Sequence, residues 1–539
     1  MRHRAGLVCG VVCVAVAAGC SAVPSGQPTL PVNRPATAPL NFAGRSSAIL
    51  RADLVRAGYI AQAGARPMPR PQPMRGTNRW RLSQPATSGQ IEGYALRAAV
   101  TPGQPVVLRV STTAPLFSVA AYRFGWYSGG QAARVWRSGW SPGHVQAAQS
   151  FASGDRRTVV APWRDSMRVP TLGWPAGAYV LKLVASTGWQ SYVPLIVRST
   201  STAGKVALVA PVATWQAYND WGGYSLYTAP FGQHESWAVS FDRPYAGHGS
   251  NLGAADMLYG VRPVVVEAER AGVPLAYLTD LDVAADPGIL RGARAYVSMG
   301  HDEYWTPSMR AAVLQARAHG TNLAFLGADT EFWRIRLASS ATGPDRVVVG
   351  YRWDYQQDPA IHRHPARATA PFGFPPDPRP EQALTGMRYE CFPVSAPYTV
   401  TSPHWWGFAG TGVHAGSRFP DLVGVEADRV YPSPATPRPL QILSSTGYSC
   451  LGVQTSAQSV YYTTSSGAGV FNAGTLHWTC ALLDACGPYP VSPRTAAFTR
   501  TVTANLLRVF ARGPAGRTHP AHDNVADYRL PAQHTVPAD

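Results

Sequence analysis

"YVSMGHDEYW", residues 296–305, joins a short apolar strand to a helix through a turn at Gly300. Thr306 suits the N-cap of that helix, Pro307 its first turn and Gly320 its end. Outward from this stretch, apolar strand patterns alternate with helix patterns. We expect strands within 205–211, 274–280, 293–300 and 321–328, and helices within 262–273, 286–293 and 306–320. This alternation predicts an α/β domain with a parallel sheet and helices on both faces.

The predicted α/β domain spans residues 201–512. Strand patterns within 421–431, 440–445 and 459–478 are expected to extend its sheet, and a last helix is expected at 493–511. In its expected topology the domain resembles the glutamine-amidotransferase-like (flavodoxin-like) group, which carries a nucleophilic cysteine on a strand-to-helix turn.

The flanking segments have different compositions. Residues 91–200 alternate apolar and polar positions between Gly, Pro and Ser turns, which predicts an all-β immunoglobulin-like sandwich. Residues 21–90 are rich in proline, as in "RPMPRPQPMRG" at 66–76, and predict a semi-extended tether. Residues 513–539 are expected to be an unstructured tail.

Residues 1–20 have the layout of a bacterial lipoprotein signal peptide. The basic "MRHR" precedes an apolar run that is too short to span a bilayer comfortably, and Ala18 and Gly19 precede Cys20. Lipidation of Cys20 would anchor the protein on the extracytoplasmic face of the cell membrane. An ordinary cleaved signal, which would leave the protein secreted, is the alternative.

Four cysteines remain after the signal: Cys391, Cys450, Cys480 and Cys486. An even number in an exported protein predicts two disulfides. The short "CALLDAC" loop favours Cys480–Cys486 together with Cys391–Cys450, although four cysteines allow three pairings. The chain has no CxxC pair, which disfavours a zinc-thiolate site.

The net charge of +17, from 47 basic and 30 acidic residues, raises the question of a polyanionic partner. The two lysines are Lys182 and Lys205, and the arginines are spread along the sequence rather than clustered. An exported protein meets little nucleic acid, so no nucleic acid is expected as a partner. Attraction to anionic lipid or to an anionic cell-wall polymer is the better interpretation of the charge, and an oligomer stays open.

Ionisable side chains follow several predicted strands, where ligands bind in open parallel sheets. His301, Asp302 and Glu303 follow one strand, and "TWQAYNDWGGYSLY" at 214–227 and "FLGADTEFWR" at 325–334 contain two other strand ends. The turn at 300–303 holds no Ser or Cys and carries no GxSxG, which disfavours covalent catalysis there. Phenols and carboxylates are hard oxygen ligands, so the set favours a hard or trivalent cation and water activation.

These motifs, together with "SMGHDEYW" at 298–305 and "LVGVEADR" at 422–429, resemble the C-terminal domain of the N,N-dimethylformamidase large (beta) subunit-like family. The resemblance covers roughly residues 200–512. It implies a mononuclear Fe(3+) centre, held by two tyrosinates and one glutamate, that hydrolyses a small amide. By motif the metal ligands would be Tyr218, Tyr227 and Glu303, with Tyr224 as a rival to Tyr227.

The resemblance also implies roles for neighbouring residues. His301 and Glu426 are candidate catalytic groups that move protons. Asp329, at a position where the resemblance implies an asparagine, is a third candidate catalytic group and adds charge to the pocket. Asn219 and Phe471 are expected to line the substrate pocket.

The sequence therefore predicts an exported, lipid-anchored, metal-dependent hydrolase of carbon–nitrogen bonds other than peptide bonds. The alternative is a non-catalytic cell-surface or cell-wall binding lipoprotein that keeps the fold. The retained Tyr/Tyr/Glu set argues against that alternative.

Overall fold

The computed structural model of the protein describes residues 74–530, apart from residues 88, 155, 250, 484, 487 and 488. The predicted signal, Cys20 and the predicted tether up to residue 73 lie outside the described residues. The described chain is mostly β, with several sheets and some helices. None of its helices combines the length and the apolar character that crossing a bilayer requires.

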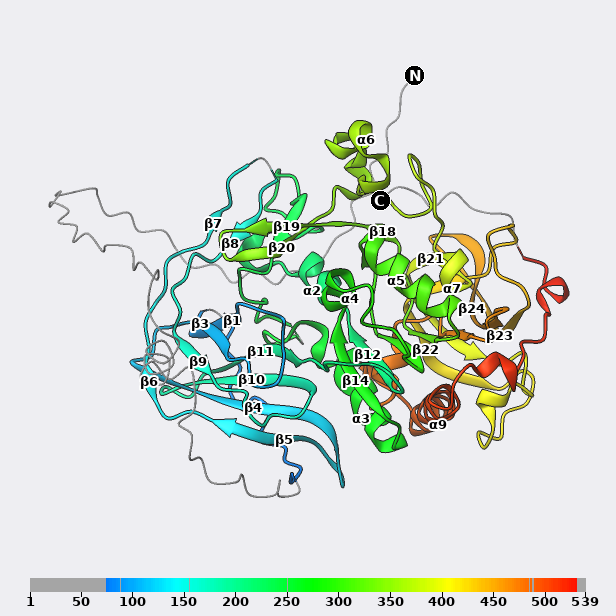
Figure 1. The fold of residues 1–539 in the computed structure, drawn as a ribbon, viewed down its shortest axis with the longest axis horizontal. Helices are drawn as coiled ribbons and strands as arrows, with labels where there is room; N and C mark the ends of the chain where they lie inside the picture. The colour runs from blue at the N-terminus through cyan, green and yellow to red at the C-terminus, as the bar shows by residue number, and fades with distance from the viewer. Residues whose placement is uncertain are drawn as a thin grey trace, which may run out of the picture. The chain divides into compact units, whose positions relative to one another are not determined.

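A seven-stranded sheet forms the centre of the C-terminal part, in the order β14-β12-β15-β17-β25-β24-β23 (Figure 1). The first five strands are parallel, and the last two are antiparallel to their neighbours. Their bounds are Leu275–Thr279 (β14), Val206–Ala210 (β12), Ala295–Met299 (β15), Asn322–Leu326 (β17), Gly469–Asn472 (β25), Val453–Thr463 (β24) and Leu440–Cys450 (β23). The chain order reverses between β12 and β15, which is where an open α/β sheet places its ligand site.

The parallel strands are buried on both faces, as the sequence predicts. Along β12, Leu208 belongs to the core beneath α3 (Val261–Ala271) and α9 (Pro493–Phe510), while Val209 belongs to the core beneath α4 (Asp280–Ala285) and α5 (Pro307–Ala318). Figure 1 shows α3 beside α9, and α4 beside α5. Because successive strand residues point to opposite faces, one apolar run supplies both cores.

Local sequence fixes where the covering helices begin. The Thr306 hydroxyl accepts a hydrogen bond from the Met309 N–H at 3.1 Å, and Pro307 follows it at the start of α5. The helix expected at 286–293 is wrong. Residues 286–293 form turns, and the helix lies one step earlier because Thr279 and Asp282 make a capping box at the start of α4.

The segment 421–431 does not extend the central sheet, contrary to expectation. It belongs to β22 (Arg418–Arg429), which pairs antiparallel with β21 (Arg388–Thr399) in a separate two-stranded sheet. Strands β23 to β25 do extend the central sheet.

Two larger sheets make up most of the N-terminal β region, residues 91–197. One has the order β1-β3-β9, and the other has β2-β11-β10-β4-β5 with β6 paired to β4. Their bounds are Ile91–Ala95 (β1), Ala99–Val100 (β2), Val106–Thr112 (β3), Leu116–Tyr127 (β4), Gly130–Arg137 (β5), Ser141–Pro142 (β6), Met167–Val169 (β9), Gly177–Ala185 (β10) and Gln190–Val197 (β11). Leu108, Val119 and Leu181 bring the two sheets into one buried core.

Short elements complete the described part. The strands are β7 (Ser150–Phe151), β8 (Val159–Val160), β13 (Ala238–Ser240), β16 (Tyr304–Trp305), β18 (Trp333–Arg334), β19 (Arg336–Ser340), β20 (Gly343–Val349), β26 (Ala485–Cys486) and β27 (Tyr489–Pro490). The helices are α2 (Val212–Tyr218), α6 (Ala360–Arg363), α7 (Gln382–Thr385) and α8 (His477–Ala481).

The segments expected to be irregular are partly packed. Trp80 is only 3% exposed, and its ring packs edge-on against Phe124 with the ring centroids 5.3 Å apart. The expected tether therefore does not extend to residue 90. At the other end, Val525 is buried and Asn524 donates to the Ile442 carbonyl at 3.1 Å. Apolar side chains and backbone pairing hold both segments on the folded part, against the expected tail from residue 513.

The expected disulfides, Cys391–Cys450 and Cys480–Cys486, are both present. The first links β21 to the end of β23, and the second closes a short loop that follows α8.

Leu208→Ala should lower the free energy of unfolding by about 2–5 kcal/mol, because it leaves a cavity between β12 and the helices on that face. Urea unfolding followed by circular dichroism would measure this change. Leu172→Ala is the control, since Leu172 is 76% exposed and its truncation should change stability by less than about 0.5 kcal/mol. Equal effects of the two substitutions would contradict the assignment of the core.

Candidate metal centre

In the turn after β15, the backbone at Gly300 lies close to the backbone at Gly260. Gly300 has φ +86°, and a Cβ there would lie 3.0 Å from the Gly260 Cα, so a side chain would be strained on both counts. The chain then runs into β16, whose parallel pairing with β18 keeps it extended. The Thr214 hydroxyl of α2 accepts from the Glu303 N–H at 3.0 Å and from the Tyr304 N–H at 3.2 Å. These bonds fix Glu303 beside the end of β12.

Asp302 has a structural task within this turn. It accepts a hydrogen bond from the Ser298 hydroxyl at 2.7 Å and from the Trp305 indole N–H at 2.9 Å. Burial raises its pKa to about 6. Because its oxygens are engaged with the strand and the next turn, Asp302 anchors the turn while Glu303 points toward α2.

Two phenols meet the two oxygens of Glu303. Tyr218 donates to Oε2 at 2.7 Å, Tyr227 donates to Oε1 at 2.7 Å, and the two hydroxyls lie 3.0 Å apart. The two rings stack with their centroids 4.3 Å apart. The rival Tyr224 instead donates to Gln233. The structure therefore brings together the three residues named as metal ligands by motif.

Sequence reasoning missed two further residues at this cluster. Tyr304, directly after Glu303, donates its hydroxyl to the Tyr227 hydroxyl at 2.7 Å. The Arg352 guanidinium lies 3.7 Å from the centroid of the Tyr227 ring. The sequence could have indicated Tyr304, because Tyr304 directly follows Glu303 in the "DEYW" motif. Nothing in the sequence connects Arg352 with Tyr227, which lies 125 residues earlier.

His301, Asp329 and Glu426 form a second group against the first. Each offers one ligand atom, and these atoms lie within 4.8 Å of one another. The His301 Nε2 lies 3.3 Å from the Glu426 Oε2 and 3.5 Å from the Glu303 Oε2. Nε2 of His301, Oδ1 of Asp329 and Oε2 of Glu426 are buried and make no hydrogen bond within the described part of the chain. Such atoms are costly unless a ligand, water or ion satisfies them.

Burial, and after it the crowding of acidic groups, governs the electrostatics of the cluster. Burial, and then the charge of Glu303, raise the pKa of Tyr218 and Tyr227 well above the usual phenol range. The same two causes, in the same order, raise the pKa of Asp329 and Glu426. Burial lowers the pKa of His301. All of these shifts oppose charge, and a bound cation would reverse them by favouring the deprotonated oxygens.

A cavity of about 290 Å³ opens beside Tyr218 and His301. Tyr218 is 40% exposed because its ring lines this space, although its hydroxyl is held by Glu303. Asn219 also lines the cavity, but its amide bonds to Gln216, to the Pro244 carbonyl and to the Trp221 N–H. Asn219 therefore holds the loop that shapes the cavity.

Phe471 does not line that cavity, contrary to expectation. It is fully buried and stacks on Trp405 with ring centroids 5.5 Å apart. The alternation of β25 turns Phe471 into the core shared with α9, so the neighbouring Asn472 faces the other way.

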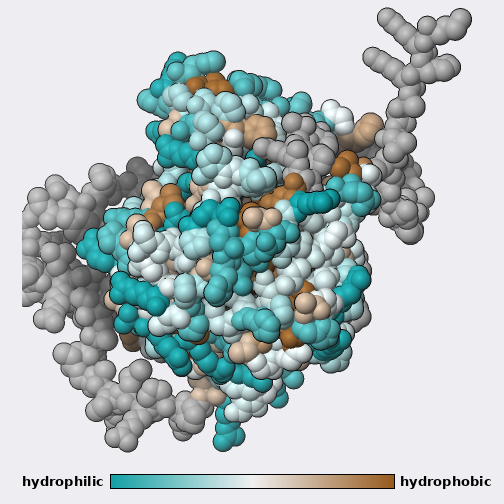
Figure 2. Space-filling view, turned by 90° about the vertical axis from the view of Figure 1, so that its right-hand side faces the viewer, coloured by the Kyte–Doolittle hydropathy of each residue, from teal (hydrophilic) through white to brown (hydrophobic). Residues whose placement is uncertain are grey.

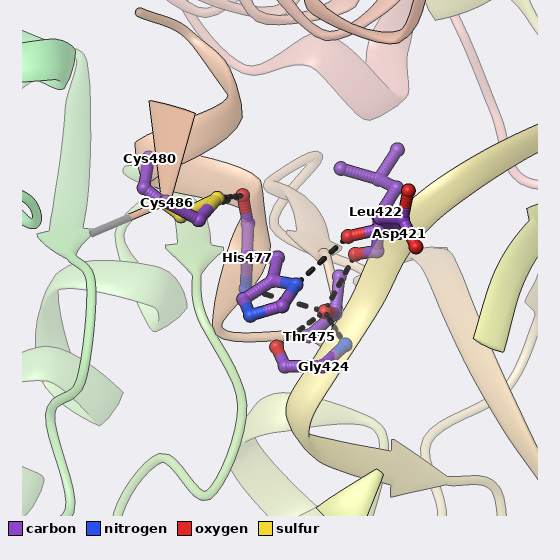
Figure 3. Close-up of a disulfide and its surroundings, with 7 residues drawn as sticks. All are labelled: Asp421, Leu422, Gly424, Thr475, His477, Cys480 and Cys486. Atoms are coloured by element: carbon purple, nitrogen blue, oxygen red, sulfur yellow. Dashed lines mark hydrogen bonds between the residues drawn. A yellow bond between two sulfur atoms is a disulfide. The ribbon is translucent and has the colours of Figure 1, made fainter. Parts of the chain in front are cut away.

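Strand β22, which carries Glu426, is held in place by the segment that starts α8 (Figure 3). The Thr475 hydroxyl donates to the Leu422 carbonyl at 2.8 Å and accepts from the Gly424 N–H at 3.0 Å. The His477 Nδ1 lies 2.8 Å from the Asp421 carbonyl oxygen, and the sulfurs of the Cys480–Cys486 disulfide contact the His477 carbonyl oxygen. These contacts fix the strand two residues before Glu426.

The residues of this cluster fit a hard cation. Two oxygens bound at about 2.0 Å in octahedral geometry lie roughly 2.8 Å apart, and the observed oxygen separations are 2.7–3.0 Å. The orphaned atoms of His301, Asp329 and Glu426 border the same space. Phenols and carboxylates supply hard donors, and the described part of the cluster contains no thiolate.

A family model described as "N,N-dimethylformamidase beta subunit-like, C-terminal" matches residues 118–488, well over half of the chain. The chain belongs to this family. The match begins within β4, so family similarity reaches into the N-terminal β region, which the motifs alone did not indicate. It ends before α9, short of the expected boundary at residue 512.

Other comparisons add little to the family assignment. No curated protein is significantly similar to the chain in sequence. Among solved structures, a Paenibacillus sp. cycloisomaltooligosaccharide glucanotransferase, complexed with cycloisomaltoheptaose, matches with 10% identity and a TM-score of 0.14. The match covers 43% of this chain and 44% of that one, less than half of the enzyme's length. So low a TM-score carries no argument about this chain.

Thr475→Val should lower the free energy of unfolding by about 1–3 kcal/mol, because the buried Gly424 N–H loses its acceptor. Thr501→Val is the matched control, since the Thr501 hydroxyl bonds to the Ala497 carbonyl on the outer side of α9. Thermal unfolding of both variants measures the difference. A Thr475 variant as stable as the control would show that this hydroxyl does not hold β22.

Proposed function

We propose that the protein is a metal-dependent amide hydrolase in which Tyr218, Tyr227 and Glu303 hold a mononuclear iron(III) ion. The observation that carries this proposal is the meeting of two phenol hydroxyls and both Glu303 oxygens within 3.0 Å. Membership of the dimethylformamidase-like family supports the reaction class. When bound, the ion would polarise an amide carbonyl and lower the pKa of water.

His301 and Glu426 are the proposed proton carriers. The His301 Nε2 and the Glu426 Oε2 lie 3.3 Å apart, and neither atom has a hydrogen-bond partner in the described chain. One of them can take a proton from the attacking water, and the other can deliver a proton to the leaving amine nitrogen. The short separation lets the two groups exchange a proton between the two steps.

Asp329 is held in position for a supporting role. Its N–H donates to the Asp428 carboxylate at 2.8 Å, and its own Oδ1 is unpaired among the described residues. Asp329 therefore presents a fixed carboxyl group to Glu303 and Glu426. We assign it to the catalytic set as a group that accepts a hydrogen bond from substrate or water.

The substrate class follows from the space beside the cluster. A cavity of about 290 Å³ lies at the small end of the range for ligand pockets. Arg352 lies over the Tyr227 ring and donates to the Leu226 carbonyl, so it closes the far side of the cluster. A small amide fits this site better than a peptide or a polysaccharide chain.

The finer fold and location belong to the same proposal. The strand order, with β14 outside β12 and β15 to β25 following on the other side, supports a glutamine-amidotransferase-like (flavodoxin-like) domain. The two packed sheets of residues 91–197 support an immunoglobulin-like sandwich. The signal pattern before Cys20 supports lipid anchoring on the extracytoplasmic face, with secretion as the alternative.

The purified protein lacking residues 1–20 should contain about one iron per chain and show a visible phenolate-to-iron absorption band. Tyr218→Phe should lose most of that band, since the hydroxyl that meets Glu303 is removed. Tyr224→Phe is the control and should keep both iron and colour, because Tyr224 bonds to Gln233. Elemental analysis and absorption spectra give the readout. A metal-free wild type, or an unchanged band in Tyr218→Phe, would refute the ligand assignment.

Glu426→Gln should lower kcat for a small amide by about 10²–10⁴-fold while leaving the iron content near that of the wild type. The amide keeps the size of the side chain but cannot carry the proton. Glu235→Gln, at an exposed carboxylate, is the control and should retain activity. Assays on a panel of small N-substituted amides would measure both. A wild type that binds iron but hydrolyses none of them would favour a non-catalytic surface protein instead.

A further inference from the structure

A groove lined only by basic, polar and apolar residues lies on the N-terminal β region, and its lining includes no residue of the metal cluster. Its volume is about 540 Å³. Its lining includes no carboxylate. Five cationic side chains line it: Arg79, Arg81, Arg134, Arg137 and Lys182. The arginines that are dispersed along the sequence are therefore gathered by the fold.

Strand alternation produces this gathering. On β4, Val119 and Ala121 face the core between the two sheets, while Ala120 and Tyr122 face the groove. Lys182 of β10 lies opposite Ala120, so its side chain emerges on the same face. Residues 78–83 form one wall of the groove.

Among the described residues, the groove cations have no acidic partner. Lys182 is only 8% exposed, and its Nζ donates to the carbonyls of Arg79 at 3.1 Å and Arg81 at 2.6 Å. Burial lowers its pKa. In the described chain none of the five cations lies within ion-pair distance of a carboxylate. By contrast Arg123, which follows Tyr122 in β4, pairs with Glu269 at 2.6 Å.

The sequence around the groove offers no counter-charge either. Residues 74–150 contain eight arginines, and Glu92 is their one acidic residue. Glu92 accepts a hydrogen bond from the Trp221 indole at 2.8 Å, away from the groove lining. Five like charges around one groove repel each other, so the arrangement favours an anionic ligand that neutralises several at once.

The Tyr122 hydroxyl lies among three of these cations. Burial raises its pKa, and the charges of Arg134, Arg79 and Arg137 act in the opposite direction, in that order of strength. Trp140, which is 51% exposed, adds an aromatic surface at the rim. The groove thus combines several forked guanidinium donors with one apolar surface.

We propose that this groove binds a segment of a phosphate-rich anionic polymer that carries no nucleobases. Guanidinium groups pair with phosphate through two parallel hydrogen bonds, which suits Arg79, Arg81, Arg134 and Arg137. Single-stranded nucleic acids need successive exposed aromatic rings for their bases, and the groove exposes Trp140 while Tyr122 is buried. The proposal goes beyond amide hydrolysis and does not rest on it.

The test uses the protein lacking residues 1–20 and three probes: inorganic polyphosphate, a single-stranded DNA with the same number of phosphates, and vesicles containing phosphatidylglycerol. Calorimetric titration at two salt concentrations gives the affinities. Polyphosphate should bind more tightly than the other two probes, and its affinity should fall as salt rises.

A charge-matched pair of variants locates the site. Arg134→Glu with Arg137→Glu should weaken polyphosphate binding about tenfold or more, because both exposed side chains line the groove. Arg363→Glu with Arg512→Glu makes the same change in net charge at exposed positions outside the groove lining and should weaken it by about twofold or less. Amide hydrolysis should be unchanged in both variants.

Four results would overturn the proposal. They are no binding of polyphosphate by the wild type, equal losses in the two double variants, tighter binding of the DNA, and binding to the vesicles alone. Circular dichroism spectra of the variants exclude unfolding as the cause of a loss.

Discussion

The contact on which the candidate site depends is the Glu303 carboxylate held between the Tyr218 and Tyr227 hydroxyls at 2.7 Å each. It joins the ends of β12 and β15, the two strands between which the chain order of the sheet reverses. Thr214 supports it by binding the backbone N–H groups of Glu303 and Tyr304. Because the loops after these strands diverge, the carboxylate and phenols meet at an open end of the sheet rather than inside a helix layer.

This contact has an electrostatic consequence for its surroundings. Glu303, Asp329 and Glu426 are all buried. Burial, and then the charge of Glu303, oppose the ionisation of Asp329, of Glu426 and of the two phenols. A chain that gathers three carboxylates at one buried point carries a cost that a cation removes. Two sets of contacts hold the repelling groups together. They are the turn at Gly300 with the Asp302 hydrogen bonds, and the hydrogen bond of Thr475 to the Gly424 N–H of β22.

Charge is divided between two regions of the described chain. Carboxylates and phenols converge at the carboxyl ends of the parallel strands, while arginines without an acidic partner among the described residues line a groove on the six-stranded sheet. The face of the molecule in Figure 2 is largely hydrophilic, and its hydrophobic areas are small and scattered. Localised charge distinguishes the two regions that we propose bind ligands.

The sequence by itself determined the parallel sheet, the helix starting at Thr306, the short Cys480–Cys486 disulfide loop and the motif residues of the candidate site. These features depend on neighbours in the chain: apolar runs, caps and turns are local. The tertiary structure alone decided that Tyr227 rather than Tyr224 meets Glu303, that Tyr304 and Arg352 join the cluster, and that Phe471 turns into the core. It also decided that β22 leaves the central sheet, that Trp80 packs, and that dispersed arginines share one groove. Such outcomes depend on which face of a strand meets which distant segment, and that is fixed by packing between elements far apart in the chain.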